Sequence, residues 1–140
     1  MIVIGVDGSE GGAAALEFAA EEAALRGTPL RIISAWEVPV VAYGAGEVPT
    51  LDPATLEGFR LRAEQIAKDA AAKAKELQPS LEVEALTVTG QPADALLAQG
   101  AEADLIVVGR RGLGGFRSLL LGSVSQQVVH HATCPVVVVQ

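Results

Sequence analysis

A run of four apolar residues at positions 105–108 constrains the fold more than any other part of the sequence. A strand that is apolar on both faces is typical of a parallel sheet that helices cover on both sides. Parallel neighbours need long crossover connections, usually helices. The sequence supplies these connections, because short apolar runs alternate with amphipathic stretches along the whole chain. We therefore predict one α/β domain over residues 1–140, with a doubly wound (Rossmann-like), five-stranded parallel sheet and helices on both faces.

The expected elements follow from apolar spacing and from the glycines and prolines between the runs. Strands are expected at residues 1–6, 29–36, 81–88, 104–108 and 135–140. Ser9 can cap a first helix that Gly27 ends, and Pro92 can open a short third one. The second helix, which Pro79 ends, should carry its apolar stripe on Leu56, Phe59, Ala63, Ile66, Ala70 and Leu77. A fourth helix is expected from Ser123 to about residue 132.

Charge and composition exclude several classes of protein. The net charge of −7 argues against a general nucleic-acid binder, which needs a basic face for phosphate contacts. No apolar run approaches the roughly eighteen residues of a membrane span. The N-terminus enters a strand pattern without a basic leader, which argues against secretion. The only cysteine, Cys134, cannot form an internal disulfide, so we expect a cytoplasmic protein.

Charge is distributed unevenly along the chain. All 17 acidic side chains lie at or before Asp104, whereas residues 105–140 contain Arg110, Arg111 and Arg117. An acid-free segment with three arginines can hold an anion site. Burial of the segment in the core is the alternative explanation for the missing acids, but it does not explain three arginines in one glycine-rich loop.

Two strand ends are expected to meet in one crevice. The first strand ends in Asp7-Gly8-Ser9, and the fourth leads into the glycine-rich loop that starts at Gly109. Ligands of open α/β sheets bind beyond the carboxyl ends of strands, where the strand order reverses. Glycines let backbone N–H groups approach a phosphate, and the start of the following helix adds unpaired N–H groups. The hydroxyls of Ser123 and Ser125 are further candidate donors; a simple connection with Ser123 as a cap is the alternative.

Glycine spacing separates this loop from other nucleotide motifs. The sequence has neither a P-loop motif nor a Gly-x-Gly-x-x-Gly motif. Gly109-x-x-Gly112, nine residues, then Gly122-Ser123 instead resembles the motif of ATP-binding universal stress proteins. The opening strand with Asp7-Gly8-Ser9 and the closing segment 131–139 are similar to that family too, so the resemblance covers essentially the whole chain.

The resemblance implies roles for particular residues. Asp7, Gly8 and Ala35 would line the adenine and ribose pocket, with Val108 against the base. The phosphates would be held by Gly109, Gly112, Gly122, Ser123, Val124 and Ser125. Arg110 and Arg111 occupy variable positions of the motif, so their phosphate contact is inferred from charge alone. The implied ligand is ATP, together with Mg²⁺, and the implied assembly is a homodimer through the C-terminal strand, whose apolar edge has no protecting charge.

Several residues have two readings. Asp7 can bond a ribose hydroxyl or a Mg²⁺-bound water, or it can simply cap the first helix with Ser9. His130 and His131 are adjacent on a helix and are not expected to bind metal. Cys134 is expected to be a packed, unreactive thiol. The segment 37–52 is long enough to be a lid, with Tyr43 over the nucleotide, or simply mobile.

Two function classes follow from these readings. The favoured hypothesis is an ATP-binding regulatory protein of the stress response, acting by nucleotide-dependent conformation or partner binding. The alternative is a slow ATPase or phosphotransferase. Phosphoryl transfer needs a group that orients the nucleophile, and Asp7 is the only acid evident near the expected site.

Overall fold

The computed structural model describes residues 1–37, 52–112 and 120–140 and confirms the predicted α/β fold. Five parallel strands form one sheet in the order β3-β2-β1-β4-β5. The strands are β1 (Ile2–Gly5), β2 (Leu30–Trp36), β3 (Val83–Thr89), β4 (Leu105–Gly109) and β5 (Val136–Val139). The helices are α1 (Glu10–Arg26), α2 (Pro53–Leu77), α3 (Pro92–Gly100) and α4 (Ser123–His131). Tyr43 and Arg117 lie outside the described residues.

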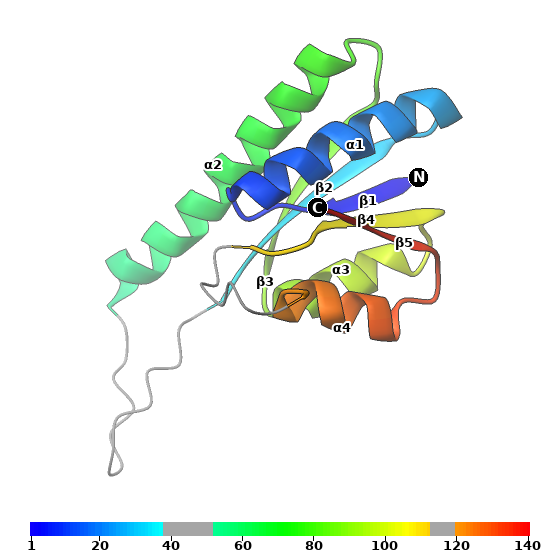
Figure 1. Ribbon diagram of the computed structural model, residues 1–140. Helices are drawn as coiled ribbons and strands as arrows, with labels where there is room; N and C mark the ends of the chain where they lie inside the picture. The colour runs from blue at the N-terminus through cyan, green and yellow to red at the C-terminus, as the bar shows by residue number, and fades with distance from the viewer. Residues whose placement is uncertain (38–51, 113–119) are drawn as a thin grey trace.

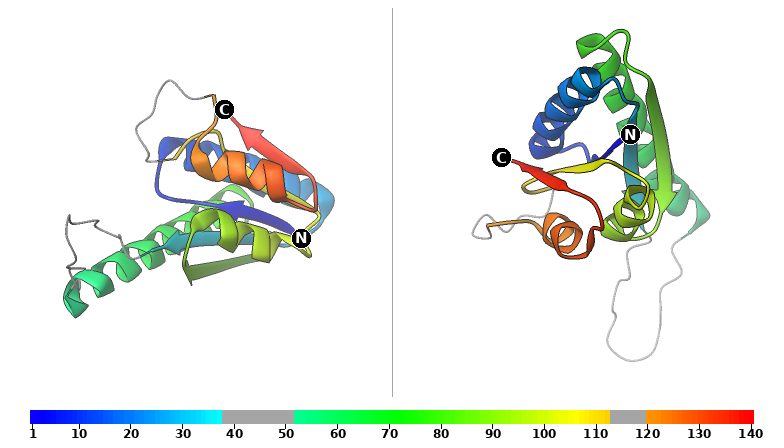
Figure 2. Two further views of the ribbon diagram at one scale, coloured as in Figure 1. Left: turned by 90° about the horizontal axis from the view of Figure 1, so that it is seen from below. Right: turned by 90° about the vertical axis from the view of Figure 1, so that its right-hand side faces the viewer.

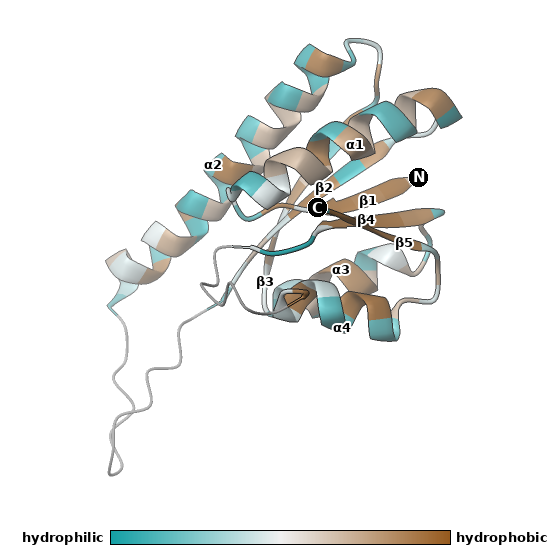
Figure 3. Cartoon of the chain, in the orientation of Figure 1, coloured by the Kyte–Doolittle hydropathy of each residue, from teal (hydrophilic) through white to brown (hydrophobic). Residues whose placement is uncertain are grey.

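Two pairs of helices cover the two faces of the sheet. Figure 1 and the right-hand view of Figure 2 show α1 and α2 on one face and α3 and α4 on the other. Figure 3 shows the central strands in brown, the colour of hydrophobic residues, whereas teal, the colour of hydrophilic residues, appears along the helices. Ile4 and Val107 face the α1–α2 core, and Val3 and Ile106 face the α3–α4 core. The run at residues 105–108 is therefore buried on both sides, as its composition predicts.

Helix α1 begins and ends at the expected residues. Ser9 Oγ accepts a hydrogen bond from the backbone N–H of Gly12 at 3.1 Å. Gly27 follows the last turn in the left-handed conformation, with φ of 60°, which glycine adopts at little cost.

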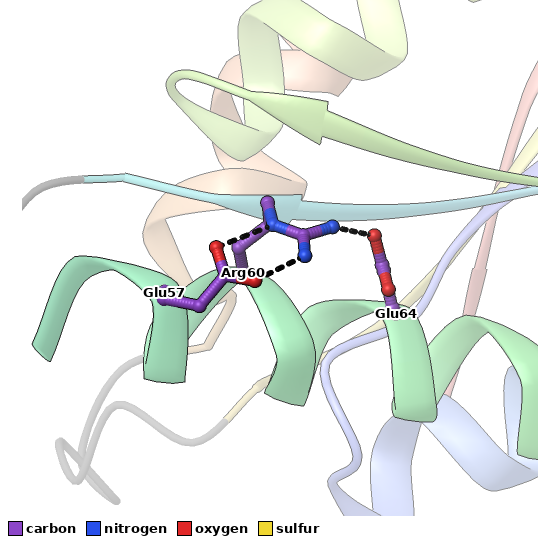
Figure 4. Close-up of polar contacts among 3 residues, drawn as sticks. All are labelled: Glu57, Arg60 and Glu64. Atoms are coloured by element: carbon purple, nitrogen blue, oxygen red, sulfur yellow. Dashed lines mark hydrogen bonds and ion pairs between the residues drawn. The ribbon is translucent and has the colours of Figure 1, made fainter. Parts of the chain in front are cut away.

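The predicted apolar stripe of α2 is partly wrong. The buried residues of the helix are Ala63, Ala67, Ala70 and Ala74, whereas Phe59 is exposed. Small side chains let α2 pack closely on the core, and its first turns extend past the sheet in Figure 1. On these turns Arg60 pairs with Glu57 and Glu64, as Figure 4 shows. Such pairs at i+3 and i+4 spacing support an exposed helix by a few tenths of a kcal/mol each.

The two edge strands differ in character. Strand β3 starts two residues later than predicted and carries the exposed Glu84, which suits an edge. Strand β5 carries four valines, and each of them is partly exposed in the single chain. None of the helices in the described residues combines the length and the apolar character that a membrane crossing requires.

Candidate functional site

A cavity opens where the strand order reverses. The chain runs from β1 outward to β3, then returns to place β4 on the other side of β1. At the carboxyl ends of these strands lies a cavity of about 730 Å³. It is lined by Gly5, Val6, Asp7, Ser9, Gly12, Ile33, Ala35, Glu37, Pro92, Leu96, Val108, Gly109, Arg111, Gly112, Gly122, Ser123, Val124 and Ser125. Asp7 and the glycine-rich loop thus share one crevice, as the sequence predicts.

One end of the cavity is formed by apolar side chains on the α3 side of the sheet. Ile33, Ala35 and Glu37 alternate along β2 and its end, so they point to the same face. Pro92 and Leu96 of α3 line the cavity opposite them. A β-carbon at Gly5 would lie 2.7 Å from Leu96 Cδ1, so α3 approaches β1 closely here. We call this part, with Val108, the apolar end.

The other end is formed by backbone from β4, α1 and α4. A β-carbon at Gly109 would lie 2.6 Å from the carbonyl oxygen of Gly11, and one at Gly11 would lie 2.5 Å from that of Arg111. The backbone of the loop after β4 therefore packs directly on the start of α1. A β-carbon at Gly112 would lie 2.2 Å from Asp7 Oδ2. Glycine at these positions is required by close packing.

Helix α4 begins at this glycine end without a side-chain cap. Gly122 is the N-cap residue, and as a glycine it has no side chain that could bond the first N–H groups of the helix. The backbone N–H of Gly122 itself donates to the carbonyl of Arg110 at 2.8 Å. A helix start of this kind attracts anions through its unpaired N–H groups and its dipole. The first turn of α1, by contrast, has Ser9 as a cap.

Asp7 connects the end of β1 to both helix α1 and the loop. Its Oδ1 accepts a hydrogen bond from the backbone N–H of Ser9 at 2.9 Å. Its Oδ2 occupies the space beside Gly112 that a β-carbon would fill. Asp7 thus bonds the N-cap residue of α1, and its side chain also lines the cavity.

Ten of the twelve predicted site residues line the cavity, and two do not. Gly8 lies outside, at φ of 81°, in a turn conformation that favours glycine. Arg110 also lies outside: its Nε donates to the carbonyl oxygen of Leu120 at 2.8 Å. Of the two described arginines in this loop, Arg111 lines the cavity.

Ser125 differs from its expected role as a phosphate donor. Its side chain is buried, and its hydroxyl donates to the carbonyl of Gly109 at 2.6 Å. This hydrogen bond therefore links α4 to the end of β4. Ser123, by contrast, is exposed and lines the cavity.

Sequence reasoning missed the residues of the apolar end, chiefly Glu37, Pro92 and Leu96. Glu37 directly follows β2 and Pro92 comes shortly after β3, so the strand-end rule that identified Asp7 could have found both. His130 and His131 are exposed in the last turn of α4. Within the described ranges, no group of three or more His, Cys, Asp or Glu side chains could hold a metal ion. Cys134 is partly buried, and its thiol faces the carbonyl of Gly100.

Comparisons with known proteins identify a family. Residues 1–140 match the profile of the Universal stress protein family. A universal stress protein from Thermus aquaticus is 41% identical over 141 residues, which cover 99% of this chain and 97% of that protein. The chain spans less than half the length of the mycobacterial relatives that it matches, between 43% and 45% of each.

Solved structures share the fold over nearly the whole chain. A universal stress protein crystallised in complex with cAMP is 29% identical, with a TM-score of 0.72 over 99% of this chain and 94% of that one. A universal stress protein from Lactobacillus plantarum is 27% identical, with a TM-score of 0.79 over 99% of this chain and 96% of that one.

Proposed function

This chain belongs to the universal stress protein family, and on that premise we propose that it binds ATP in the cavity at the switch point. Binding would favour one conformation or one partner surface, so the protein acts as a regulator in the stress response. The related structure that holds cAMP supports an adenine nucleotide as the ligand.

The observation that carries the proposal is the division of the cavity into two chemically different ends. The apolar end suits a purine ring, because stacking and burial need only apolar contact. The glycine end, with the uncapped start of α4 and Arg111, suits phosphates. The volume of about 730 Å³ lies within the roughly 300–1,000 Å³ that is usual for small-molecule sites.

Magnesium would accompany the nucleotide. Mg²⁺ is usually held by one or two carboxylates, substrate phosphates and water. Asp7 lines the cavity beside Gly112 at the glycine end, and each oxygen of a carboxylate can accept more than one hydrogen bond. It would therefore hold a Mg²⁺-bound water or a ribose hydroxyl.

Titration calorimetry with ATP and with adenosine tests the proposal. Both should bind, and ATP should bind more tightly because only it reaches the glycine end. Gly122→Val should abolish ATP binding while the protein stays folded, because the branched side chain would crowd Arg110 and Arg111 and block the start of α4. In the parent, the β-carbon position of Gly122 lies 3.3 Å from Arg111 Cα. ATP binding to Gly122→Val at parental affinity would refute the site.

An enzymatic role is the second hypothesis, as a slow ATPase or phosphotransferase at the same site. Catalysis requires a group that orients the nucleophile. The described lining residues include two acids, Asp7 and Glu37, and neither lysine nor histidine. Decay of ATP in single-turnover conditions separates the two hypotheses: loss of one equivalent within minutes would favour the enzyme.

A homodimer through β5 is the proposed assembly. The four valines of β5 are partly exposed, and in the described chain the strand pairs with β4 alone. Antiparallel pairing with the same strand of a second copy would satisfy the backbone and bury the valines. Light scattering should find a dimer for the parent and a folded monomer for Val137→Lys. A parent that is monomeric at micromolar concentration would refute the dimer.

A further inference from the structure

An exposed leucine, Leu120, lies close to both the glycine end of the cavity and the β5 edge of the sheet. It is 82% exposed, and its carbonyl accepts the hydrogen bond from Arg110 Nε. The backbone N–H of Arg110 in turn donates to the carbonyl of Val139, the last residue of β5, at 2.7 Å. In the right-hand view of Figure 2, the chain that enters α4 lies on the same side of the molecule as the C-terminal end. Leu120 therefore borders the edge strand whose valines are partly exposed.

The backbone of Arg110 joins this edge to the start of α4. Its N–H reaches Val139, and its carbonyl accepts from the N–H of Gly122, the N-cap residue of α4, at 2.8 Å. The hydroxyl of Ser125 adds a bond to the carbonyl of Gly109. All of these bonds end on backbone carbonyls, so the position of the helix start depends on the position of the edge. A contact that fixes the edge therefore also restrains the N–H groups at the start of α4.

This face of the molecule fits a second copy of the chain. Antiparallel pairing about a two-fold axis puts the carboxyl end of one β5 strand beside the amino end of the other. Thr133 and Pro135, which precede β5, are both exposed, so in such a dimer Leu120 would meet that segment of the partner subunit. Residues 120–140 contain no Asp, Glu, Lys or Arg. Two chains of net charge −7 can therefore meet here without placing like charges opposite each other.

We propose that Leu120 packs on the partner subunit in the dimer, and that the second copy thereby completes the glycine end of the cavity for phosphates. The inference rests on the proposed function and the proposed assembly, and it adds the regulation of the site. A restrained helix start loses less freedom when it binds a phosphate, so the dimer binds ATP more tightly than the monomer. Coupling between two sites is commonly fivefold or more, and it acts equally in both directions. Adenosine does not reach the glycine end and is not coupled.

The dimer dissociation constant, measured by light scattering over a dilution series, tests the contact. Leu120→Ser should raise it about a hundredfold or more, because both leucines of the dimer lose their burial. Leu25→Ser is the matched control: Leu25 is 84% exposed in the last turn of α1, and its loss should change nothing. A dimer has two sites, so saturating ATP should lower the parental constant by the square of the coupling factor, about 25-fold or more. Adenosine should leave the constant unchanged.

Calorimetry on the monomeric variant Val137→Lys tests the same coupling from the nucleotide side. This variant should bind ATP about fivefold more weakly than the parent dimer or worse, and adenosine equally well. Adding Leu120→Ser to Val137→Lys should weaken ATP no further, because no partner is left to lose.

Equal ATP affinity of dimer and monomer, an unchanged dimer constant in Leu120→Ser, or a further loss of ATP affinity in the double variant would overturn the inference and leave ATP binding standing. A parent that is monomeric would overturn the inference together with the dimer. A parent that does not bind ATP would overturn the inference together with the proposed function.

Discussion

Replacement of Gly109 by alanine tests the close packing between β4 and α1. The added β-carbon would lie 2.6 Å from the carbonyl oxygen and 2.7 Å from the carbonyl carbon of Gly11. The first distance is about 0.8 Å shorter than the 3.4 Å at which ordinary contact begins. Both neighbours are backbone atoms, so no side chain can rotate away and the start of α1 must move.

The cost of that movement can be estimated from other overpacked sites. Extra methyl groups in well-packed interiors typically cost about 1–3 kcal/mol. For a chain of this length, the corresponding fall in Tm is roughly 4–12 °C. The displaced start of α1 would also open the glycine end, so ATP should raise the Tm of Gly109→Ala less than it raises that of the parent.

Thermal unfolding followed by circular dichroism measures the effect, and Gly58→Ala provides a control of opposite sign. Gly58 is exposed within α2, and nothing lies within 4 Å of its β-carbon position. Alanine should stabilise that helix by about 0.5–1 kcal/mol. If the Tm of Gly109→Ala lies within about 1 °C of the parental Tm, the fall is well below the expected one. The contact between β4 and α1 is then not rigid, and the reasoning fails.

Four further substitutions test separate parts of the site. Arg111→Ala should weaken ATP about tenfold or more and leave adenosine unchanged, whereas Arg110→Ala should change ATP less than about threefold, both measured by calorimetry. Ser125→Ala should lower the free energy of unfolding in urea by about 1–3 kcal/mol, because the carbonyl of Gly109 loses its donor; an unchanged midpoint would contradict this. Asp7→Asn should keep stability within about 1 kcal/mol, since one oxygen can still accept from Ser9, while the Mg²⁺ dependence of ATP affinity falls.

The fold was predictable because it depends on patterns that are local in the sequence. Burial on both faces of residues 105–108 required a covered parallel sheet, and alternation of strands and helices then left few topologies. The stripe of α2 was predicted less well. Spacing does not show where a helix outruns the sheet: the first turns of α2 extend past it, so Phe59 is exposed, whereas Ala67, two turns further on, is buried.

The site was predictable where it depends on strand ends and less so where it depends on side-chain partners. Asp7 follows β1 and Gly109 ends the adjacent strand β4, so topology alone brings them together. Arg110 and Arg111 are equivalent by charge, but in the structure Arg110 donates to the carbonyl of Leu120 whereas Arg111 lines the cavity. Ser125 is a plausible phosphate donor by sequence, yet its proton is used by a carbonyl sixteen residues earlier in the chain.

The glycines of the motif serve packing as well as ligand approach. At Gly109, Gly112 and Gly122, a β-carbon would meet Gly11, Asp7 and Arg111 respectively, all within the protein itself. These contacts draw the loop after β4 onto the start of α1 and the start of α4 onto the loop. The same contacts bring the uncapped N–H groups of α4 to the edge of the cavity. The glycine spacing therefore predicts a backbone arrangement first, and an anion site follows because that arrangement leaves the helix start facing open space.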